Sequence, residues 1–402
     1  MKTFFSFHLC TPWLSRRSLL SWSAGLVLAS VFGTATAGGK PYSYHITGNV
    51  PPTKLATPAA PSIVLMGGGP DVDEAFRWMI TRAGIKPSTG GRFVVIRATG
   101  TEAYDPYIYY SDAALTTSTT VADQWVGGAS LGLSSVETLV IPNVTAANDD
   151  FVNSVVQQAN AVFIAGGDQS DYIKYWKGTK LQTSLQGLMT NNIPIGGTSA
   201  GLAVLGQFDF AALNGSVTST QALSNPYNKY MTLDPSPLSL KGGFLAPPAL
   251  TNTILDSHLD SRDRMGRLIS FVARLVAPQV APGGTTGCAG GILTTGNISS
   301  ATARGIGVSV ETALLVQGNG ETQPYTARRV TNPSNMTTES AVYFVRPSIP
   351  PTTCASGNPL TMRTVEIQRL MDSNTIFNLS DWTGLPSYFV DAISGSLTSS
   401  PY

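Results

Sequence analysis

Residues 193–206, IPIGGTSAGLAVLG, contain an apolar run, a glycine-rich corner and a stretch of small residues compatible with a helix. Ser199 lies at this corner between Gly197 and Gly201, so the sequence matches the pattern G-x-S-x-G. In a strand–turn–helix context, such a serine is either part of a tight structural turn or a nucleophile exposed on a strained elbow. The surrounding sequence favours the nucleophile.

Four more apolar runs precede this stretch and predict buried strands, as does the run 193–199 itself. They lie at 62–69, 92–99, 136–142 and 161–167. Segments of helical composition, such as VDEAFRWMITRAG, separate them. Buried strands that alternate with helices predict a mainly parallel sheet in a three-layer α/β/α sandwich, in which ligands bind at the carboxyl ends of the strands.

The second half of the chain is richer in Thr, Ser and Gly, and we expect further strands there at 303–317, 340–348 and 364–371. We interpret them as additional sheet of the same domain, which would extend from 62 to 402 after a proline-rich lead at 38–61. Hydrophobic residues make up 42% of the 402 residues and charged residues 12%, which permits a large core and excludes a disordered chain.

Residues 1–37 have the pattern of an export signal, with a basic start, an apolar run and a small-residue end of the A-x-A type. The Arg16–Arg17 pair resembles a bacterial twin-arginine signal, while an ordinary secretory signal or an N-terminal anchor are the alternatives. Removing this segment changes the net charge from +1 to −2, and a near-neutral body does not favour a nucleic-acid partner. We expect a secreted or periplasmic bacterial protein without membrane attachment.

The cysteines outside the signal, Cys288 and Cys354, both lie in predicted loops. In an oxidising compartment they are expected to form one disulfide, and two surface thiols are the alternative. Two cysteines and two histidines do not make an obvious metal site, so we expect no metal and no cofactor.

A serine nucleophile usually needs a base, which is most often histidine. The chain contains three histidines, His8, His45 and His258. His8 lies in the expected signal and His45 in the lead before the first core strand, so elimination selects His258. A capping or solvated histidine is the alternative at this position.

Charged residues surround His258 in the sequence. Asp256 lies two residues before it and either orients the ring or caps the following helix. Arg262, Arg264 and Arg267 follow, and guanidinium groups bind carboxylates in a bidentate manner, which indicates recognition of an acidic substrate. A solvated helix face, paired with the neighbouring aspartates, is the alternative.

A second glycine-rich loop, FIAGGDQSDY at 163–172, follows the predicted strand before the serine strand. Gly166 and Gly167 can turn backbone N–H groups toward a ligand, and Gln169 can donate to or accept from a peptide. A simple strand-ending turn is the alternative.

Together these segments resemble the cyanophycinase and peptidase E family of serine peptidases. The matching pieces occur in order between residues 62 and 317 and read VLMGGGPD, FIAGGDQ, GGTSAGLAVLG, LDSHLDSRDRMGRL and GIGVSVETALLV. Histidine followed by this arginine pattern resembles cyanophycinases in particular. The resemblance implies a fold like that of class I glutamine amidotransferases and a homodimer. It also implies cleavage of cyanophycin, a poly-aspartate with arginine on each β-carboxylate, to β-aspartyl-arginine dipeptides.

By position, the resemblance implies roles for the residues singled out above. Ser199 would be the nucleophile and His258 the base. The backbone N–H groups of Gly167 or Asp168 and of Ala200 would form the oxyanion hole. The substrate-side residues would be Gln169, Asp256, Arg262, Arg264 and Arg267.

One segment departs from the family pattern, which typically reads G-I-G-x-D-E-x-T-A with the glutamate as the acid of the triad. Residues 305–313 read GIGVSVETA, so Ser309 and Val310 replace the acidic pair and Glu311 lies one place later. In a strand, a shift of one residue moves a side chain to the opposite face. Glu311 therefore completes the triad only if a bulge re-aims it; otherwise Asp256 or a water molecule orients His258.

We therefore expect a secreted serine peptidase that hydrolyses cyanophycin through an acyl-enzyme on Ser199. Two alternatives remain open at this point. One is an aspartyl dipeptidase of the peptidase E type. The other is a degenerate homologue that binds the polymer without cutting it.

Overall fold

The computed structural model describes residues 39–51, 54–110, 127–235, 243–278, 287–288, 301–319, 322–332 and 340–402. Lys40–Tyr402 forms one compact unit. The export signal predicted at 1–37 lies outside the described residues. Within the described ranges, every helix is too short or too polar to cross a membrane.

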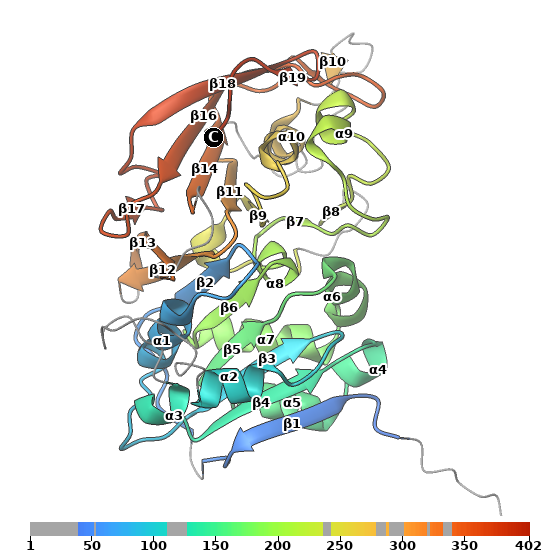
Figure 1. Ribbon diagram of the computed structural model, residues 1–402. Helices are drawn as coiled ribbons and strands as arrows, with labels where there is room; N and C mark the ends of the chain where they lie inside the picture. The colour runs from blue at the N-terminus through green and yellow to red at the C-terminus, as the bar shows by residue number, and fades with distance from the viewer. Residues whose placement is uncertain are drawn as a thin grey trace, which may run out of the picture. The chain divides into compact units, whose positions relative to one another are not determined.

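A nine-stranded sheet contains the first six strands of the chain and three later ones (Figure 1). Its order is β1 (Ser43–Gly48), β4 (Ser135–Val140), β3 (Arg92–Arg97), β5 (Ala161–Ile164), β6 (Ile195–Thr198), β2 (Ser62–Met66), β12 (Thr312–Asn319), β13 (Thr322–Thr331) and β17 (Phe377–Asn378). The strands from β4 to β2 in this order run parallel, and the others pair antiparallel. The five predicted buried strands form the parallel part, which confirms the mainly parallel α/β fold.

Helices cover both faces of this sheet because its strands are apolar on both faces. In β2, Val64 and Met66 pack into one core cluster and Ile63 and Leu65 into another. The first cluster includes side chains of α1 (Asp73–Arg82) and α2 (Tyr104–Tyr110), near which α3 (Gly128–Leu131) also lies. The second includes α4 (Val144–Ala147), α5 (Asp150–Gln157), α6 (Gln169–Trp176) and α7 (Lys180–Thr190). The arrangement is a three-layer sandwich.

The segment interpreted from the sequence as a lead contains a strand. β1 pairs antiparallel with β4 along its whole length and forms one edge of the nine-stranded sheet. The Tyr44 hydroxyl on β1 donates a hydrogen bond of 2.9 Å to the buried Glu137 carboxylate on β4. The sheet therefore begins before the first apolar run at 62–69.

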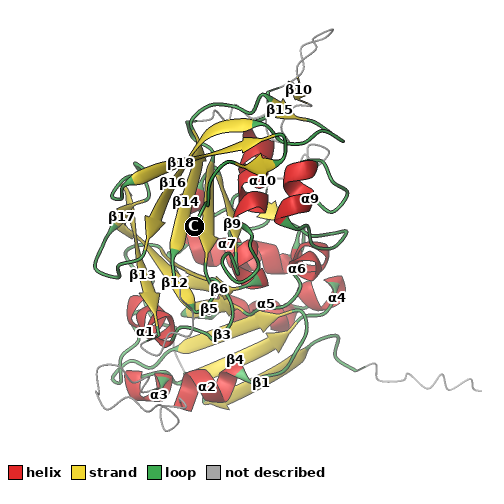
Figure 2. Ribbon diagram, turned by 45° about the horizontal axis from the view of Figure 1, so that its top comes forward, coloured by secondary structure: helices red, strands yellow, loops and turns green. Residues whose placement is uncertain are grey.

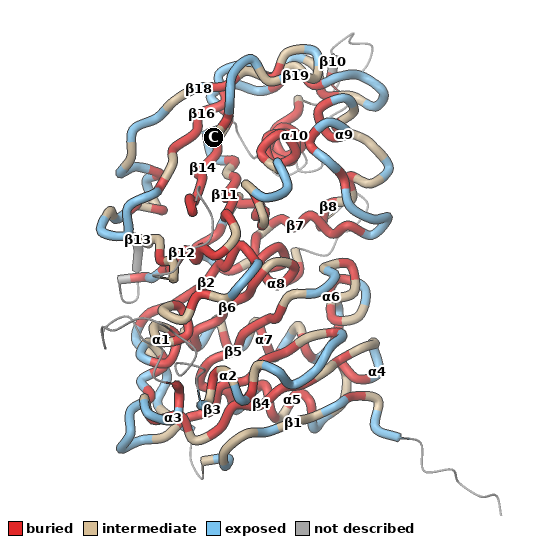
Figure 3. Tube along the Cα trace, viewed as in Figure 1, coloured by how far each residue is buried: buried red, intermediate tan, exposed pale blue. Residues whose placement is uncertain are grey.

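A second, six-stranded sheet contains most of the late strands (Figure 2). Its order is β19 (Ser396–Leu397), β18 (Ser387–Ile393), β16 (Met362–Leu370), β14 (Val342–Pro347), β11 (Arg304–Val308) and β9 (Thr253–Asp256). It shares a hydrophobic core with α9 (Ser219–Ser224) and α10 (Met265–Val276). Every residue of α10 is buried, as its continuous red trace in Figure 3 shows.

The predicted strand at 303–317 is two strands in two different sheets. β11 pairs with β9 and β14 in the six-stranded sheet, whereas β12 pairs with β2 and β13 in the nine-stranded sheet. The chain turns between them, and Glu311 in this turn has a positive φ of 55°. The apolar residues on either side of the turn are so similar that sequence pattern alone does not reveal the break.

Short elements complete the described part of the chain. They are β7 (Asp209–Phe210) paired with β8 (Leu233–Asp234), β10 (Gly287–Cys288) paired with β15 (Thr353–Cys354), the four-residue helix α8 (Ala200–Ala203) and the 3₁₀ turn Pro248–Leu250.

Cys288 and Cys354 are neighbours in the β10–β15 pair, but they are thiols without a disulfide between them. Both side chains pack in the hydrophobic core under the six-stranded sheet. The Cys288 Sγ donates to the Pro351 carbonyl at 3.2 Å, and burial raises the pKa of Cys354 to about 12. The predicted disulfide is therefore wrong for this structure, in which both cysteines are buried thiols.

Candidate active site

Ser199 lies at the corner between β6 and α8, at the carboxyl end of the parallel strands. Its backbone has φ 53° and ψ −113°, a conformation that residues with side chains rarely adopt. The Ser199 N–H donates to the Met66 carbonyl at 3.1 Å, and the Ser199 carbonyl accepts from the Ala203 N–H at 3.0 Å. The structure therefore holds a serine on a strained strand-to-helix corner.

Both glycines of the G-x-S-x-G pattern are required by close backbone approach. A Cβ on Gly197 would lie 2.5 Å from the Gly201 carbonyl group. A Cβ on Gly201 would lie 2.0 Å from the Ile164 carbonyl oxygen on β5. Such distances are far below van der Waals contact, so only glycine lets α8 begin this close to the sheet.

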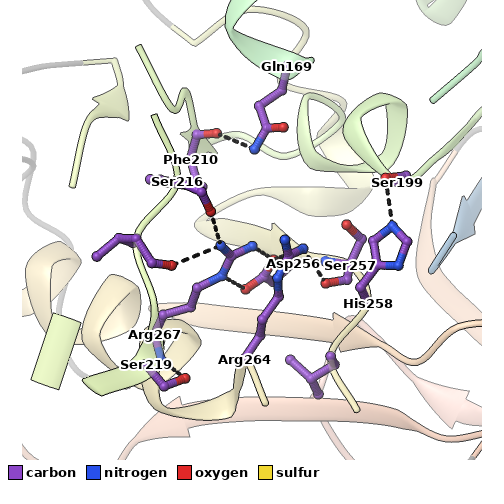
Figure 4. Close-up of polar contacts among 12 residues, drawn as sticks. Gln169, Ser199, Phe210, Ser216, Ser219, Asp256, Ser257, His258, Arg264 and Arg267 are labelled. Atoms are coloured by element: carbon purple, nitrogen blue, oxygen red, sulfur yellow. Dashed lines mark hydrogen bonds and ion pairs between the residues drawn. The ribbon is translucent and has the colours of Figure 1, made fainter. Parts of the chain in front are cut away.

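His258 contacts Ser199 directly. It lies two residues beyond β9 and has a positive φ of 49°. Its Nε2 atom is 2.8 Å from the Ser199 Oγ, which is hydrogen-bond distance (Figure 4). The serine and the histidine selected from the sequence therefore meet, although one follows a strand of the nine-stranded sheet and the other a strand of the six-stranded sheet.

The surroundings of His258 favour its neutral form. Burial, together with the positive charges of Arg262 and Arg264, lowers its pKa from 6.5 to about 4, while Asp256 acts in the opposite direction. A neutral imidazole can accept the proton of a serine hydroxyl, whereas an imidazolium cannot. At neutral pH the pair is thus ready for proton transfer from Oγ to Nε2.

Asp256 and Arg267 form a buried ion pair, which corrects their assignment to the substrate side. Arg267 Nε lies 2.7 Å from Oδ2 of Asp256 and Nη2 lies 2.5 Å from Oδ1, a bidentate arrangement visible in Figure 4. Each side chain is only 2% exposed. Arg267 Nη1 also donates to the Ser216 Oγ and the Val217 carbonyl, both at 3.1 Å. These contacts use both groups inside the protein.

The other two arginines reach a cavity of about 230 Å³. Its lining residues are Gly167, Asp168, Gln169, Ala212, Gly215, Ser216, Arg262 and Arg264. Arg264 also donates to the Ser257 carbonyl at 2.8 Å, and burial lowers its pKa to about 10, which leaves it cationic at neutral pH. The cavity thus offers two guanidinium groups and one carboxylate.

The wall of this cavity adjoins the serine through the glycine-rich loop after β5. A Cβ on Gly166 would lie 3.5 Å from the Ser199 Cβ, which is ordinary contact distance. In the same loop, Asp168 caps α6 by accepting the Ser170 N–H at 2.8 Å, and Gln169 donates to the Phe210 carbonyl at 3.4 Å. The sequence-predicted residues Gly167, Asp168 and Gln169 therefore line the cavity beside Ser199.

Sequence reasoning missed the part of the cavity wall that Ala212, Gly215 and Ser216 contribute. They lie in the loop after β7, which reads AALNGSV at 211–217 and contains no motif that indicates a binding site. Ala212 has a positive φ of 48°, a conformation that would have been expected only of glycine or asparagine. Only the folded chain reveals this wall.

Glu311 lies close to the loop after β2 and is 7% exposed. Its N–H donates to the Gly68 carbonyl at 2.9 Å, and its Cγ lies 3.7 Å from where a Cβ on Gly69 would be. The preceding Val310 N–H donates to Asp260 Oδ1 at 3.0 Å. The turn that carries Glu311 is thereby joined to the segment that carries His258.

Among the residues that the structure describes, His, Cys, Asp and Glu side chains do not gather in groups of three suited to a metal ion.

Residues 123–222, which include the GGDQ loop and the Ser199 corner, match the model of Peptidase family S51. The chain is similar to the crystal structure of a peptidase from an acI-B1 Actinobacterium, with 15% identity, a TM-score of 0.40, and coverage of 80% of this chain and 98% of the other. It is also similar to a candidate peptidase E protein from Listeria monocytogenes EGD-e, with 13% identity, a TM-score of 0.32, and coverage of 68% and 100%. No curated protein matches the chain.

Proposed function

We propose that this protein is a secreted serine peptidase that hydrolyses cyanophycin to β-aspartyl-arginine dipeptides. The observation that carries the proposal is the contact of 2.8 Å between Ser199 Oγ and His258 Nε2 on a strained corner, beside a cavity with two guanidinium groups. The match of residues 123–222 to Peptidase family S51 supports peptide hydrolysis as the reaction.

The geometry suggests the course of the reaction. His258 Nε2 takes the proton of Ser199 Oγ while Oγ forms a bond to the aspartyl carbonyl carbon. The backbone N–H groups of Ala200 and of Gly167 or Asp168 stabilise the oxyanion of the tetrahedral intermediate. The C–N bond then breaks, the amine leaves with the proton from His258, and Ser199 carries an ester. Water hydrolyses this ester by the same steps, with His258 again as the base.

The charges of the cavity support an acidic substrate that also carries arginine. Arg262 and Arg264 would bind carboxylate oxygens of an aspartyl chain, since a guanidinium group offers two parallel donors. Asp168, on the same wall as Gln169, would bind the arginine side chain of the substrate. A cavity lined by charges of a single sign would bind either the carboxylate or the guanidinium group of β-aspartyl-arginine, but would repel the other.

We assign the acid of the triad to Glu311 and leave Asp256 out. Asp256 is already bound in a bidentate manner by Arg267 and accepts the Ser257 N–H at 2.9 Å. The backbone of Glu311 is bound by the loop after β2, Gly67–Gly69, and the Gly67 carbonyl of this loop also accepts the His258 N–H.

Export by the segment at 1–37 fits the proposed function, because a polymer released by other cells is degraded outside the cell.

The proposal is tested by incubating the purified protein, without residues 1–37, with cyanophycin. We expect the suspension to clear and β-aspartyl-arginine to be found by mass spectrometry. Arg264→Gln should raise KM by about tenfold or more, because it removes a charged hydrogen-bonding group of the cavity. The matched control is Arg363→Gln, which changes an exposed arginine that pairs with Asp391.

The same assays distinguish cyanophycin hydrolysis from the second candidate function, an aspartyl dipeptidase. The volume of about 230 Å³ is small and favours a short peptide, as an aspartyl dipeptidase would bind. Hydrolysis of Asp-X dipeptides with no clearing of the polymer would establish that function and overturn the first. Absence of hydrolysis in both assays would contradict the peptidase proposal itself.

A second prediction concerns pH. Only neutral His258 accepts the proton of Ser199, so we expect the reaction of Ser199 with a fluorophosphonate to slow as the pH falls through about 4. Arg262→Gln removes a positive charge that lowers the His258 pKa, so the loss of reactivity should begin at a higher pH. The measurement is the labelling rate as a function of pH, with Arg363→Gln as the control. A wild-type midpoint at 6.5 would contradict the assigned environment of His258.

A further inference from the structure

The loop after β2, Gly67–Gly69, contacts the backbone of the base and of the acid assigned above. The Gly67 carbonyl accepts the His258 N–H at 2.7 Å, and the Gly68 carbonyl accepts the Glu311 N–H at 2.9 Å. Met66, immediately before the loop, accepts the Ser199 N–H. Three consecutive residues, Met66–Gly68, therefore bind the main chains of three segments that are far apart in the sequence.

Gly68 is in addition packed against the imidazole itself. It has a positive φ of 95°, and a Cβ built on it would lie 2.4 Å from His258 Nε2 and 2.5 Å from Cε1. These distances are at least 0.5 Å below the 3.0 Å limit that real Cβ atoms keep, so a side chain on Gly68 would force one of the two residues to move. Nε2 is the nitrogen that lies 2.8 Å from Ser199 Oγ, so the Cα of Gly68 bounds the ring on the reacting side.

The backbone of His258 has little freedom to move away from Gly68, because the chain on both sides of His258 is held by hydrogen bonds. Its own N–H is bound to the Gly67 carbonyl, and the Leu259 N–H donates to the Val308 carbonyl at 3.2 Å. The Ser257 carbonyl accepts from Arg264 Nη1 at 2.8 Å. The clash of a methyl group on Gly68 with His258 would therefore be relieved chiefly by rotation of the imidazole, which would move Nε2 away from Ser199.

We propose that Gly68 is a positioning residue for the base: its lack of a side chain lets the imidazole of His258 lie against the loop with Nε2 directed at Ser199. The proposal rests on the proposed function, in which His258 takes the Ser199 proton. It gives a physical role to a glycine of the segment VLMGGGPD, which the sequence analysis used only for the family resemblance.

The test compares Gly68→Ala with Gly84→Ala. Gly84 also has a positive φ, of 74°, but a Cβ on it meets nothing within 4 Å, so this variant introduces the backbone strain without the clash. We expect Gly68→Ala to slow the labelling of Ser199 by a fluorophosphonate by about 100-fold, because a displacement of about 1 Å of a reacting group has that effect. The KM for cyanophycin should change less than twofold, because Gly68 does not line the cavity. Gly84→Ala should label at the wild-type rate.

A thermal unfolding cycle tests the same contact without any use of activity. Gly68→Ala is made in the wild-type and in the His258→Ala background, where the imidazole is absent. We expect Gly68→Ala to lower Tm by several degrees in wild type, and in the second background by no more than Gly84→Ala does. This cycle remains informative if Gly68→Ala alone folds poorly.

The outcomes separate the two proposals. If wild-type Ser199 does not react with the phosphonate, the proposed function fails, whereas the unfolding cycle still tests the contact. If Gly68→Ala labels Ser199 as fast as Gly84→Ala does, the positioning role is overturned. It is equally overturned if the Tm change caused by Gly68→Ala is the same with and without the imidazole.

Discussion

Ser199→Ala is expected to abolish the proposed turnover of cyanophycin, with a loss in kcat of about 10⁴-fold to 10⁶-fold, because it removes the atom that forms the acyl-enzyme in the proposed mechanism. The fold should be retained, since alanine at φ 53° is no more strained than serine and the side chain occupies less space. The measurement is release of β-aspartyl-arginine, together with far-UV circular dichroism and the unfolding midpoint of the variant.

Ser154→Ala is the matched control for this prediction. Ser154 lies on α5, and its hydroxyl donates only to the Phe151 carbonyl one turn earlier, at 2.8 Å. This variant should hydrolyse the polymer at the wild-type rate. If Ser199→Ala released the same dipeptide at more than about 1% of the wild-type rate, Ser199 would not be the nucleophile.

Asp256 and Glu311 are expected to respond to substitution in opposite ways. Asp256→Asn should destabilise the protein by about 3–5 kcal/mol, because Arg267, itself only 2% exposed, loses its counter-charge while it stays buried. Glu311→Gln should leave stability within about 1 kcal/mol, and it should lower kcat by about 10²-fold to 10⁴-fold through loss of a charge that stabilises the imidazolium.

The measurements are urea unfolding and kcat for both variants, at a temperature at which each is folded. Each variant is the control for the other, because both replace a buried carboxylate by the isosteric amide. A collapse of turnover in Asp256→Asn with unchanged stability would make Asp256 the acid of the triad. Unchanged turnover in Glu311→Gln would remove Glu311 from it.

The parallel half of the nine-stranded sheet was predictable because each of its strands is buried on both faces. Such a strand is a continuous apolar run, and five of these runs separated by helical segments permit few arrangements. β1 was not predictable by the same criterion. It is an edge strand with polar residues on one side, and only its pairing with β4 identifies it as part of the sheet.

The choice of Ser199 and His258 needed no structure. The G-x-S-x-G pattern marks a corner where backbone segments must approach closely, and elimination among three histidines left one candidate base. The structure adds that the two side chains are 2.8 Å apart. The arginines were harder to assign, because their spacing in the sequence does not tell which of them faces the cavity and which enters the core.

What the sequence by itself determined is the class of fold and the pair of residues most suited to nucleophilic chemistry, since both depend on local pattern and composition. Only the tertiary structure decided the rest. It sent Arg267 to Asp256 in the core and Arg262 and Arg264 to the cavity, and it divided the strand at 303–317 between two sheets. These outcomes depend on contacts between segments far apart in the chain, which local patterns do not encode.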